Sequence, residues 1–411
     1  MTTNAAPPPL DPTELTSMEI DKAVEKIVRH AADLKASDLF ILTEESGVRI
    51  AVRRLGIVET IMAVSRDFGK HIIINFKAMA GMDISEHRRP TDGRRIGVFD
   101  GRRLDLRINC IATLHGEDVA IRMWDHDQGL LGLDELGMAA GDLKKLRQML
   151  QCPTGLILVT GPTGTGKTTT LYAALEALND GTRKINTLED PIEYALAGVR
   201  QSQVVPKIGI GFPELLRSIL RQAPDVIMVG EIRDEGTAHT AVRAANSGHL
   251  VLATLHSPVA ASAVQSMLAL GTSPFFLSSC LLGVVAQRLV RTLCSSCCMS
   301  YDISESPQTF EEIRNLLDEG EGNKIFGPSG CEACFQQGYA GRTGLFEIMT
   351  MNQEIRRLIA ASRPAAELQQ AAIKTGMTEF HRSALLKVAQ GVTSTEEILR
   401  DLPPEHLGLE D

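Results

Sequence analysis

Residues 161–169, with the sequence GPTGTGKTT, combine glycines, threonines and one lysine in a spacing that suits phosphate binding. An apolar run precedes them at 155–160, and a helical pattern follows at 170–178. Glycines allow backbone N–H groups to converge on phosphate oxygens, and a helix that starts at this point directs its positive end toward them. The stretch therefore predicts a loop that binds a nucleoside triphosphate.

The loop fits the pattern G-x-x-x-x-G-K-[ST], which assigns a role to two of its side chains. Lys167 is expected to reach the β- and γ-phosphates, and Thr168 to coordinate Mg²⁺. The expected nucleotide-binding residues are Gly161, Pro162, Thr163, Gly164, Thr165, Gly166, Lys167, Thr168 and Thr169. A glycine-rich turn that matches by chance is the alternative, and the flanking strand and helix patterns argue against it.

An acidic residue follows a second apolar run, VIMV at 226–229. Most P-loop enzymes place an aspartate at the end of this strand to hold Mg²⁺ through water, but here Gly230 occupies that position and Glu231 follows. We expect Glu231 to orient and polarise the attacking water. The alternative is a surface glutamate after a core strand.

Two further segments place polar residues at strand ends. NTLEDPIEY supplies Glu189, Asp190 and Glu193, and carboxyl ends of parallel strands are where such sheets bind ligands. His249 and His256 lie at opposite ends of the apolar run LVLATL. His256, at the carboxyl end, is placed to sense the γ-phosphate, although a lone histidine is commonly structural.

Composition limits the class of protein. The 411 residues suffice for two or three domains, and 42 Lys and Arg against 51 Asp and Glu give a net charge of −9, which argues against nonspecific nucleic-acid binding. No apolar stretch approaches the roughly 18 residues of a membrane span, and the N-terminus lacks the pattern of a secretory signal. We expect a cytoplasmic protein.

Hydrophobic patterns divide the chain around these motifs. Short alternating runs with two helical segments predict an α+β domain, whereas apolar runs alternating with helices predict a mostly parallel sheet covered on both faces. The expected divisions are a disordered lead at 1–16, an α+β domain at 17–127, a linker at 128–141, a P-loop domain at 142–290, a cysteine-bearing module at 291–345 and a helical region at 346–411.

Four segments in this order resemble the motifs of the type II secretion and type IV pilus assembly ATPases, a family of secretion motors. They are GPTGTGKTTTLYAAL, NTLEDPIEY, RQAPDVIMVGEIRD and SGHLVLATLHS, and the resemblance extends over about residues 35 to 400. A glycine at position 230 is normal in this family. The resemblance implies an α/β fold: a RecA-like P-loop domain, preceded by the smaller α+β domain and followed by a zinc module and a helical tail.

The resemblance also assigns arginines to the first domain. DLRINCIATLHGEDVAIRMW is similar to the segment whose arginines reach over the nucleotide, which points to Arg107 and Arg122, and RPTDGRRIG adds Arg94. An arginine from another domain neutralises charge that develops on the γ-phosphoryl group. The alternative is that these arginines form salt bridges on exposed strands.

Four cysteines form two C-x-x-C pairs: Cys294 with Cys297, and Cys331 with Cys334. Two such pairs suit tetrahedral Zn²⁺, and reduced core cysteines or a redox pair are the alternatives. The assembly and secretion branch of the family has a tetracysteine metal module here, whereas the retraction branch lacks it. The resemblance thus implies a structural zinc site, with Cys298 as a spare neighbour.

As a whole, the resemblance implies a homo-hexamer that uses ATP, Mg²⁺ and Zn²⁺ to power assembly of a secretion pseudopilus or a type IV pilus. It would work at the cytoplasmic face of the inner membrane, associated peripherally with a platform protein and without nucleic acid. Family members usually carry an additional N-terminal domain for docking, and because this sequence shows only a Pro-rich lead there, we expect another docking surface or a separate adaptor. Two alternatives are a nucleotide-responsive scaffold with little turnover and a DNA-uptake or conjugative ATPase.

Overall fold

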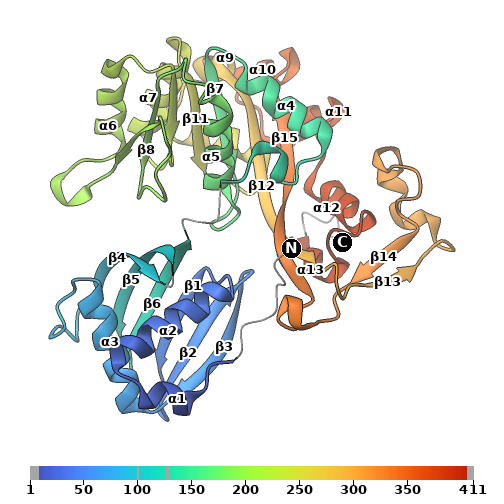
Figure 1. Ribbon diagram of the computed structural model, residues 1–411. Coiled ribbons are helices and arrows are strands. Elements are labelled where there is room, and N and C mark those ends of the chain that lie inside the picture. The colour runs from blue at the N-terminus through green and yellow to red at the C-terminus, as the bar shows by residue number, and fades with distance from the viewer. Residues whose placement is uncertain (1–8, 100, 126–129, 405–411) are drawn as a thin grey trace. The chain divides into compact units, whose positions relative to one another are not determined.

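The computed structural model describes residues 9–99, 101–125 and 130–404 (Figure 1). The chain separates into two compact units, which are described individually below. The first comprises residues 1–129 with 331–336, and the second comprises residues 130–330 with 337–411.

The first unit is built on an antiparallel sheet that, over the described residues, has six strands in the order β3-β2-β1-β6-β5-β4. Helices α2 and α3 cover one face of it, where Leu104, Leu106 and Ile108 of β5 join the core. The elements are α1 (Pro12–Ser17), α2 (Ile20–Asp33), β1 (Asp38–Thr43), β2 (Val48–Arg54), β3 (Ile57–Val64), α3 (Arg66–Met79), β4 (Thr91–Phe99), β5 (Arg102–Ala112), β6 (Glu117–Asp125) and the short 3₁₀ turn η5 (Glu332–Cys334). The expected α+β character is confirmed.

Regular structure begins within the segment 1–16, which was expected to be disordered. Helix α1 starts at Pro12, where the fixed φ of proline suits the first turn, and the Asp11 side chain accepts a hydrogen bond from the Thr13 N–H at 2.8 Å. Leu15 is fully buried in the core of the first unit. The expectation of disorder therefore does not hold for residues 9–16, and residues 1–8 lie outside the described part.

The second unit contains a mixed sheet whose seven described strands run in the order β15-β12-β7-β11-β10-β8-β9. Every pairing is parallel except that of β12 with β15. The strands are β7 (Gly155–Thr160), β8 (Ile185–Glu189), β9 (Arg200–Gln203), β10 (Val226–Val229), β11 (Leu250–Leu255), β12 (Leu281–Leu293) and β15 (Tyr339–Thr350), and a separate pair is formed by β13 (Met299–Asp302) and β14 (Lys324–Gly327). The expected mostly parallel sheet is confirmed.

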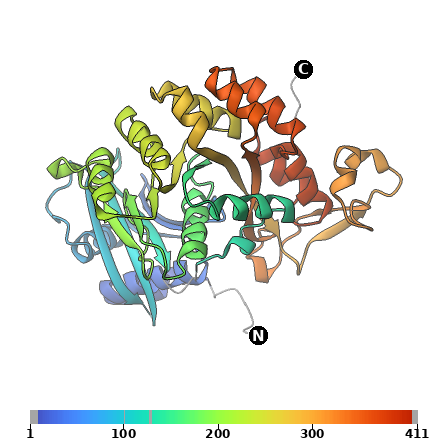
Figure 2. The same ribbon diagram turned by 90° about the horizontal axis from the view of Figure 1, so that it is seen from above.

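Helices cover both faces of this sheet, because strands such as β7 and β11 are buried along their whole length. Figures 1 and 2 show α4 and α5 on one face and α8 to α10 on the other. The helices are α4 (Ala140–Leu150), α5 (Lys167–Leu178), α6 (Phe212–Ile219), α7 (Glu235–Asn246), α8 (Ala260–Ala269), α9 (Pro274–Cys280), α10 (Gln353–Ala360), α11 (Ala365–Lys374), α12 (Phe380–Ala389) and α13 (Thr395–Asp401). Short 3₁₀ segments are η1 (Leu133–Glu135), η2 (Pro206–Ile208), η3 (Leu220–Gln222) and η4 (Pro307–Leu316).

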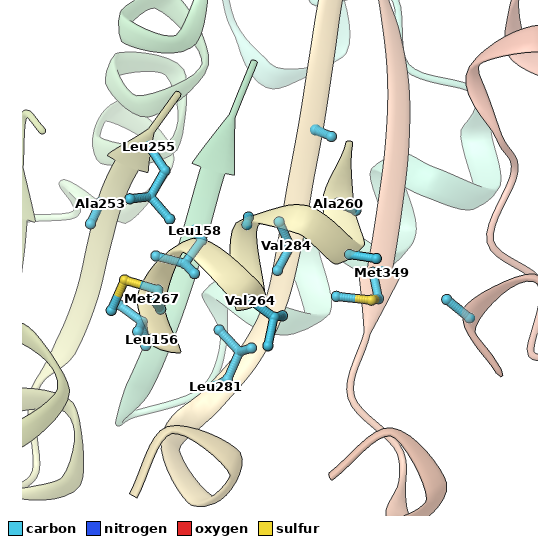
Figure 3. Packing of buried hydrophobic residues seen from close by; sticks show 14 of the residues in the cluster. Leu156, Leu158, Ala253, Leu255, Ala260, Val264, Met267, Leu281, Val284 and Met349 are labelled. Atoms are coloured by element: carbon cyan, nitrogen blue, oxygen red, sulfur yellow. The ribbon is translucent and has the colours of Figure 1, made fainter. Parts of the chain in front are cut away.

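The larger core of the second unit joins its sheet to the C-terminal helices. In Figure 3, Leu255 of β11 lies beside Leu158 of β7, Val264 of α8 lies near Leu281 and Val284 of β12, and Met349 contributes from β15. Helices α10 to α13 add buried residues to the same core. The helical region at 346–411 is thus continuous with the P-loop domain where the structure describes it, and does not form a separate body.

Two expected boundaries differ from the structure for a similar reason. Residues 290–291 and 345–346 lie inside β12 and β15, whose pairing extends the main sheet. The segment expected as a linker packs from Leu133 onward, since Leu133 and Leu136 are buried in the core that also holds α4 and α5. Residues 126–129 lie outside the described part. Among the described helices, none combines the length and apolar character needed to cross a membrane.

Candidate nucleotide-binding site

The glycine-rich loop connects the end of β7 to the start of α5. Gly161, Gly164 and Gly166 have φ values of 144°, 81° and 84°, in the region that favours glycine. A Cβ atom on Gly161 would lie 2.4 Å from the carbonyl oxygen of Gln287 on β12. The loop therefore needs glycine both for its turn and for its close packing on the neighbouring strand.

Lys167 begins α5 and is buried inside the loop. Its Nζ donates to the carbonyl oxygens of Gly161 and Pro162 at 2.7 and 2.9 Å, and lies 3.4 Å from Nδ1 of His256. Burial lowers the pKa of Lys167 to about 8, and the charge of Glu231 opposes this shift. Thr168 is exposed in the first turn of α5, in the position expected for a Mg²⁺ ligand.

Glu231 and His256 meet beside Lys167. The Nε2 atom of His256 lies 2.9 Å from Oε1 of Glu231, and Arg233 approaches Oε2 of Glu231 at 2.5 Å. Because the lysine ammonium only donates, Nδ1 of His256 must accept, which leaves Nε2 to donate to Glu231. These residues follow β7, β10 and β11, which are adjacent parallel strands, so the parallel sheet gathers them at its carboxyl edge.

Steric crowding explains the glycine that precedes Glu231. The N–H of Gly230 donates to the carbonyl of Leu188 at 2.7 Å. A Cβ on Gly230 would lie 2.9 Å from that carbonyl oxygen and 3.3 Å from Cα of Glu189. An aspartate does not fit there without a shift of the backbone, so Glu231 is the first acidic side chain available after β10.

Glu189, at the end of β8, belongs to a different set of contacts. It is buried and accepts hydrogen bonds from the Tyr172 hydroxyl, from Thr187 at 2.5 Å and from Gln201 at 3.0 Å. Burial, followed by the charge of Glu189, raises the pKa of Tyr172. Both carboxylate oxygens are therefore engaged by α5, β8 and β9, and this network ties the P-loop helix to the sheet.

Glu193 lies in the loop that follows the cis peptide bond between Asp190 and Pro191. Its side chain is half-buried, and its charge acts on Tyr194, whose pKa is raised by burial first and then by Glu189 and Glu193. The contacts of Glu193 thus lie on the β8 side of the site. His249, at the amino end of β11, bonds the carbonyl of Ala244 through Nδ1 at 3.0 Å.

In the first unit, the three arginines singled out by resemblance are neighbours across strands. Arg94, Arg107 and Arg122 stand opposite one another on β4, β5 and β6. Directly paired residues share a face of the sheet, and this face is opposite the one covered by α2 and α3. Arg94 forms a bidentate ion pair with buried Asp105, with N···O distances of 2.9 and 2.5 Å. The Arg122 side chain is 64% exposed, and its Nε lies 3.6 Å from Oδ1 of Asp38.

The four cysteines of the two C-x-x-C pairs are brought together. The sulfur atoms of Cys294, Cys297, Cys331 and Cys334 all lie within 4.8 Å of one another. The N–H of Gly330 donates to Sγ of Cys297 at 3.3 Å, and that of Cys331 to Sγ of Cys334 at 3.2 Å. Backbone donors to sulfur stabilise thiolates, and four thiolates in this arrangement fit tetrahedral Zn²⁺. Cys298 lies outside this group of four sulfur ligands.

Two residues of the site were missed by sequence reasoning. Arg233 lies within the segment RQAPDVIMVGEIRD and is an ion-pair partner of Glu231. Gln287 donates from Nε2 to the carbonyl of Thr165 in the loop at 2.7 Å. A single glutamine within the apolar run LLGVVAQRLV was the available signal, because a buried polar side chain requires a partner.

Comparison with known proteins agrees with this geometry. The family model described as type II/IV secretion system protein matches residues 14–400. The type II secretion system protein HxcR of Pseudomonas aeruginosa is 42% identical over 379 residues, which are 92% of this chain and 76% of that protein. The type II secretion system ATPase E of Vibrio cholerae is 41% identical over 383 residues, which are 93% of this chain and 75% of that protein. The type IV pilus assembly ATPase PilB of Thermus thermophilus is 36% identical over 391 residues, which are 94% of this chain and 43% of that protein.

Solved structures share the fold. The pilus retraction motor PilT with bound ADP has a TM-score of 0.64 and 25% identity, covering 94% of this chain and 99% of that one. The Legionella pneumophila ATPase DotB has a TM-score of 0.67 at 20% identity, covering 95% of each chain, and supports the fold alone. Because the family model spans almost the entire sequence and the curated relatives align over most of it, this chain belongs to the type II/IV secretion system protein family.

Proposed function

We propose that this chain hydrolyses ATP and that the energy drives assembly of a secretion pseudopilus or a type IV pilus. The observation that carries the proposal is the meeting of Lys167, His256 and Glu231 at the carboxyl edge of β7, β11 and β10, beside the glycine-rich loop. The assignment to secretion or pilus assembly is supported by the similarity to a type II secretion system ATPase and to a type IV pilus assembly ATPase. Deleting the gene and assaying secretion and piliation tests the process separately from the chemistry.

The residues of the cluster divide the chemistry among them. Lys167 neutralises the β- and γ-phosphates, and Thr168 supplies a hydroxyl ligand to Mg²⁺. Mg²⁺ lowers the charge on the phosphate oxygens when it is bound. Glu231 orients the attacking water and accepts its proton. His256 connects Glu231 to Lys167, so it holds the carboxylate in register with the phosphate site.

Glu189 and Glu193 have supporting roles in this proposal. Glu189 anchors α5 through Tyr172, so it fixes the helix that begins with Lys167. Glu193 remains the alternative proton acceptor, because it follows the neighbouring strand β8. Of the two, Glu193 is less buried and therefore has more freedom to reach a water molecule.

We propose that Arg107 and Arg122 neutralise charge on the γ-phosphoryl group. Replacing either with alanine is expected to lower steady-state hydrolysis at least about tenfold while the affinity for ADP stays within a few fold, since ADP lacks the γ-phosphate. Phosphate release and fluorescent-ADP titration measure the two quantities. Arg49→Ala, on β2 of the same sheet, is the control.

Equal losses of ADP and ATP binding in the arginine variants would show that these side chains support the fold. Unchanged hydrolysis would show that Arg107 and Arg122 do not act on the nucleotide. It would favour the alternative that they form salt bridges at the surface, as Arg122 does with Asp38.

We propose that Cys294, Cys297, Cys331 and Cys334 hold one structural Zn²⁺, because four thiolates leave no open coordination position. Protein purified without added metal is expected to contain about one zinc per chain, as measured by elemental analysis. The double variant Cys294→Ser/Cys297→Ser should lose the metal, whereas Cys298→Ser should retain it. A well-folded preparation without zinc would instead support reduced core cysteines.

The family resemblance supports a proposal for the assembly state and the location. We propose a homo-hexamer that associates peripherally with a platform protein at the cytoplasmic face of the inner membrane, with or without a separate adaptor. Mass measurement in the presence of nucleotide tests the hexamer. Co-purification with the membrane fraction, compared between strains with and without the platform protein, tests the location.

A further inference from the structure

One strand, β12, leads from the glycine-rich loop to the cysteine cluster. Its first half pairs with β7 up to Ala286, which lies opposite Thr160. At that point β7 ends and the chain turns into the loop. From Gln287 to Leu293, β12 continues with β15 alone among the described strands, as a two-stranded ribbon. The residues that follow this ribbon are Cys294 and Cys297.

The loop packs directly on the near end of the ribbon. Gln287 donates from Nε2 to the carbonyl of Thr165 at 2.7 Å, and its own carbonyl oxygen would lie 2.4 Å from a Cβ on Gly161. A Cβ on Gly166 would contact the Leu289 side chain at 3.4 Å. Both ends of the loop, at Gly161 and Gly166, therefore lie against β12. A shift of β12 at Gln287 would move the phosphate-binding backbone.

The Gln287 side chain is not explained by stability alone. It is 2% exposed, and its Oε1 atom has no hydrogen-bond partner among the residues that the structure describes. A buried oxygen without a partner is unfavourable, and an apolar side chain of the same length would avoid it. What glutamine provides at this position is the N–H donor that reaches Thr165.

The far end of the ribbon is held in place. Arg291 on β12 forms a buried two-pronged ion pair with Glu397 of α13 at 2.8 and 2.6 Å. The N–H of Leu293 donates to Val392, and that of Cys294 to Gly338, both at 2.9 Å. The cysteine cluster begins immediately after these bonds, so a bound metal would fix the strand end from which the ribbon extends back to the loop.

We propose that Gln287 is a positioning residue for the glycine-rich loop and that the tetracysteine site, by holding the ribbon, sets the position of Gln287. The two sites would then be coupled through β12: metal bound by the cysteines would strengthen nucleotide binding. This inference rests on the proposed nucleotide and zinc sites, but it assigns to the metal a role in nucleotide affinity that a purely local structural site would not have.

Gln287→Met tests the first half of the proposal. Methionine keeps the length and removes the donor, so the affinity of the full chain for a fluorescent ADP analogue is expected to fall about tenfold, the size of one net hydrogen bond. Zinc content and thermal midpoint should stay at the wild-type values. Gln369→Met is the matched control, because Gln369 also has a buried Oε1 without a partner in the described structure but bonds Glu379, not the loop.

The coupling is tested by combining Gln287→Met with Cys294→Ser/Cys297→Ser and titrating the same ADP analogue. Loss of the cysteines is expected to weaken binding several-fold to about tenfold in the wild-type background and to have no further effect when Gln287 is Met. Wild-type affinity in Gln287→Met would overturn the positioning role. Equal weakening by cysteine loss in both backgrounds, or none in either, would overturn the coupling.

Two outcomes separate this inference from the proposals beneath it. If the wild-type chain binds no ADP analogue or holds no zinc, the proposed nucleotide or metal site has failed, and the coupling fails with it. If cysteine loss unfolds the chain, Gln287→Met with zinc bound still decides the positioning role, and a nucleotide affinity unchanged from wild type would contradict it.

Discussion

Glu231→Gln is expected to reduce steady-state ATP hydrolysis by at least about 10²-fold while ATP still binds. Glutamine has the size of glutamate, so the contacts to His256 at 2.9 Å and to Arg233 at 2.5 Å are disturbed as little as possible. The amide, however, has no basicity with which to accept a proton from water. Phosphate release measures turnover, and titration with a fluorescent ATP analogue measures binding.

The matched control for this prediction is Glu235→Gln. Glu235 lies four residues further along, is 77% exposed and forms an ion pair only with His239 in the part of the chain that the structure describes, so its removal should leave turnover unchanged. If Glu231→Gln hydrolyses ATP at nearly the wild-type rate, Glu231 is not the proton acceptor. Glu193→Gln would then be the variant that loses activity.

Lys167→Ala is expected to weaken ATP and ADP binding by at least about 100-fold, because a buried ammonium group next to the phosphates contributes several charge-assisted hydrogen bonds. The Nζ atom already lies within the loop, bonded to Gly161 and Pro162. Fluorescent-nucleotide titration measures the effect. Lys184→Ala, which is exposed and immediately precedes strand β8, serves as the control.

The same titration at several pH values adds an internal check. Burial lowers the pKa of Lys167 to about 8, and only the protonated form attracts phosphate. Nucleotide affinity should therefore fall as pH rises through about 8, and Lys167→Ala should lose that dependence. Affinity that is unchanged in Lys167→Ala would contradict the assignment of the phosphate-binding loop.

The parts of the fold that follow local rules could be predicted from the sequence. The glycine-rich loop, the buried strands β7, β10 and β11, and the polar residues at their ends are each encoded within a few consecutive residues. The parallel sheet then places Lys167, Glu231 and His256 at one edge, since carboxyl ends of parallel strands lie together. Pattern reasoning was sufficient for this part because no long-range information was needed.

Features that depend on distant pairing were not predictable. The pairing of β12 with β7 adds β12 and β15 to the main sheet and joins distant residues such as Ala286 and Thr160, and no local signal marks it. The contact of Gln287 with the loop spans 122 positions, so it required the three-dimensional structure.

Residue type and position at a strand end did not distinguish catalytic carboxylates from structural ones. Glu189 has the same residue type and a similar strand-end position as a catalytic carboxylate, but its network with Tyr172, Thr187 and Gln201 is visible only after folding. The steric reason for Gly230 likewise depends on the adjacent strand β8. A motif therefore identifies candidate residues, whereas their partners decide what each can do.

The most direct test of the account is steady-state phosphate release from Mg²⁺-ATP by the full chain, compared with Lys167→Ala and Glu231→Gln. We predict continuous release over many turnovers by the wild type, with loss in both variants: through binding for Lys167→Ala and through chemistry for Glu231→Gln. A wild-type chain that binds ATP but releases no more than about one phosphate per site, well below the usual range of enzyme turnover, would contradict the motor function and identify a nucleotide-responsive scaffold.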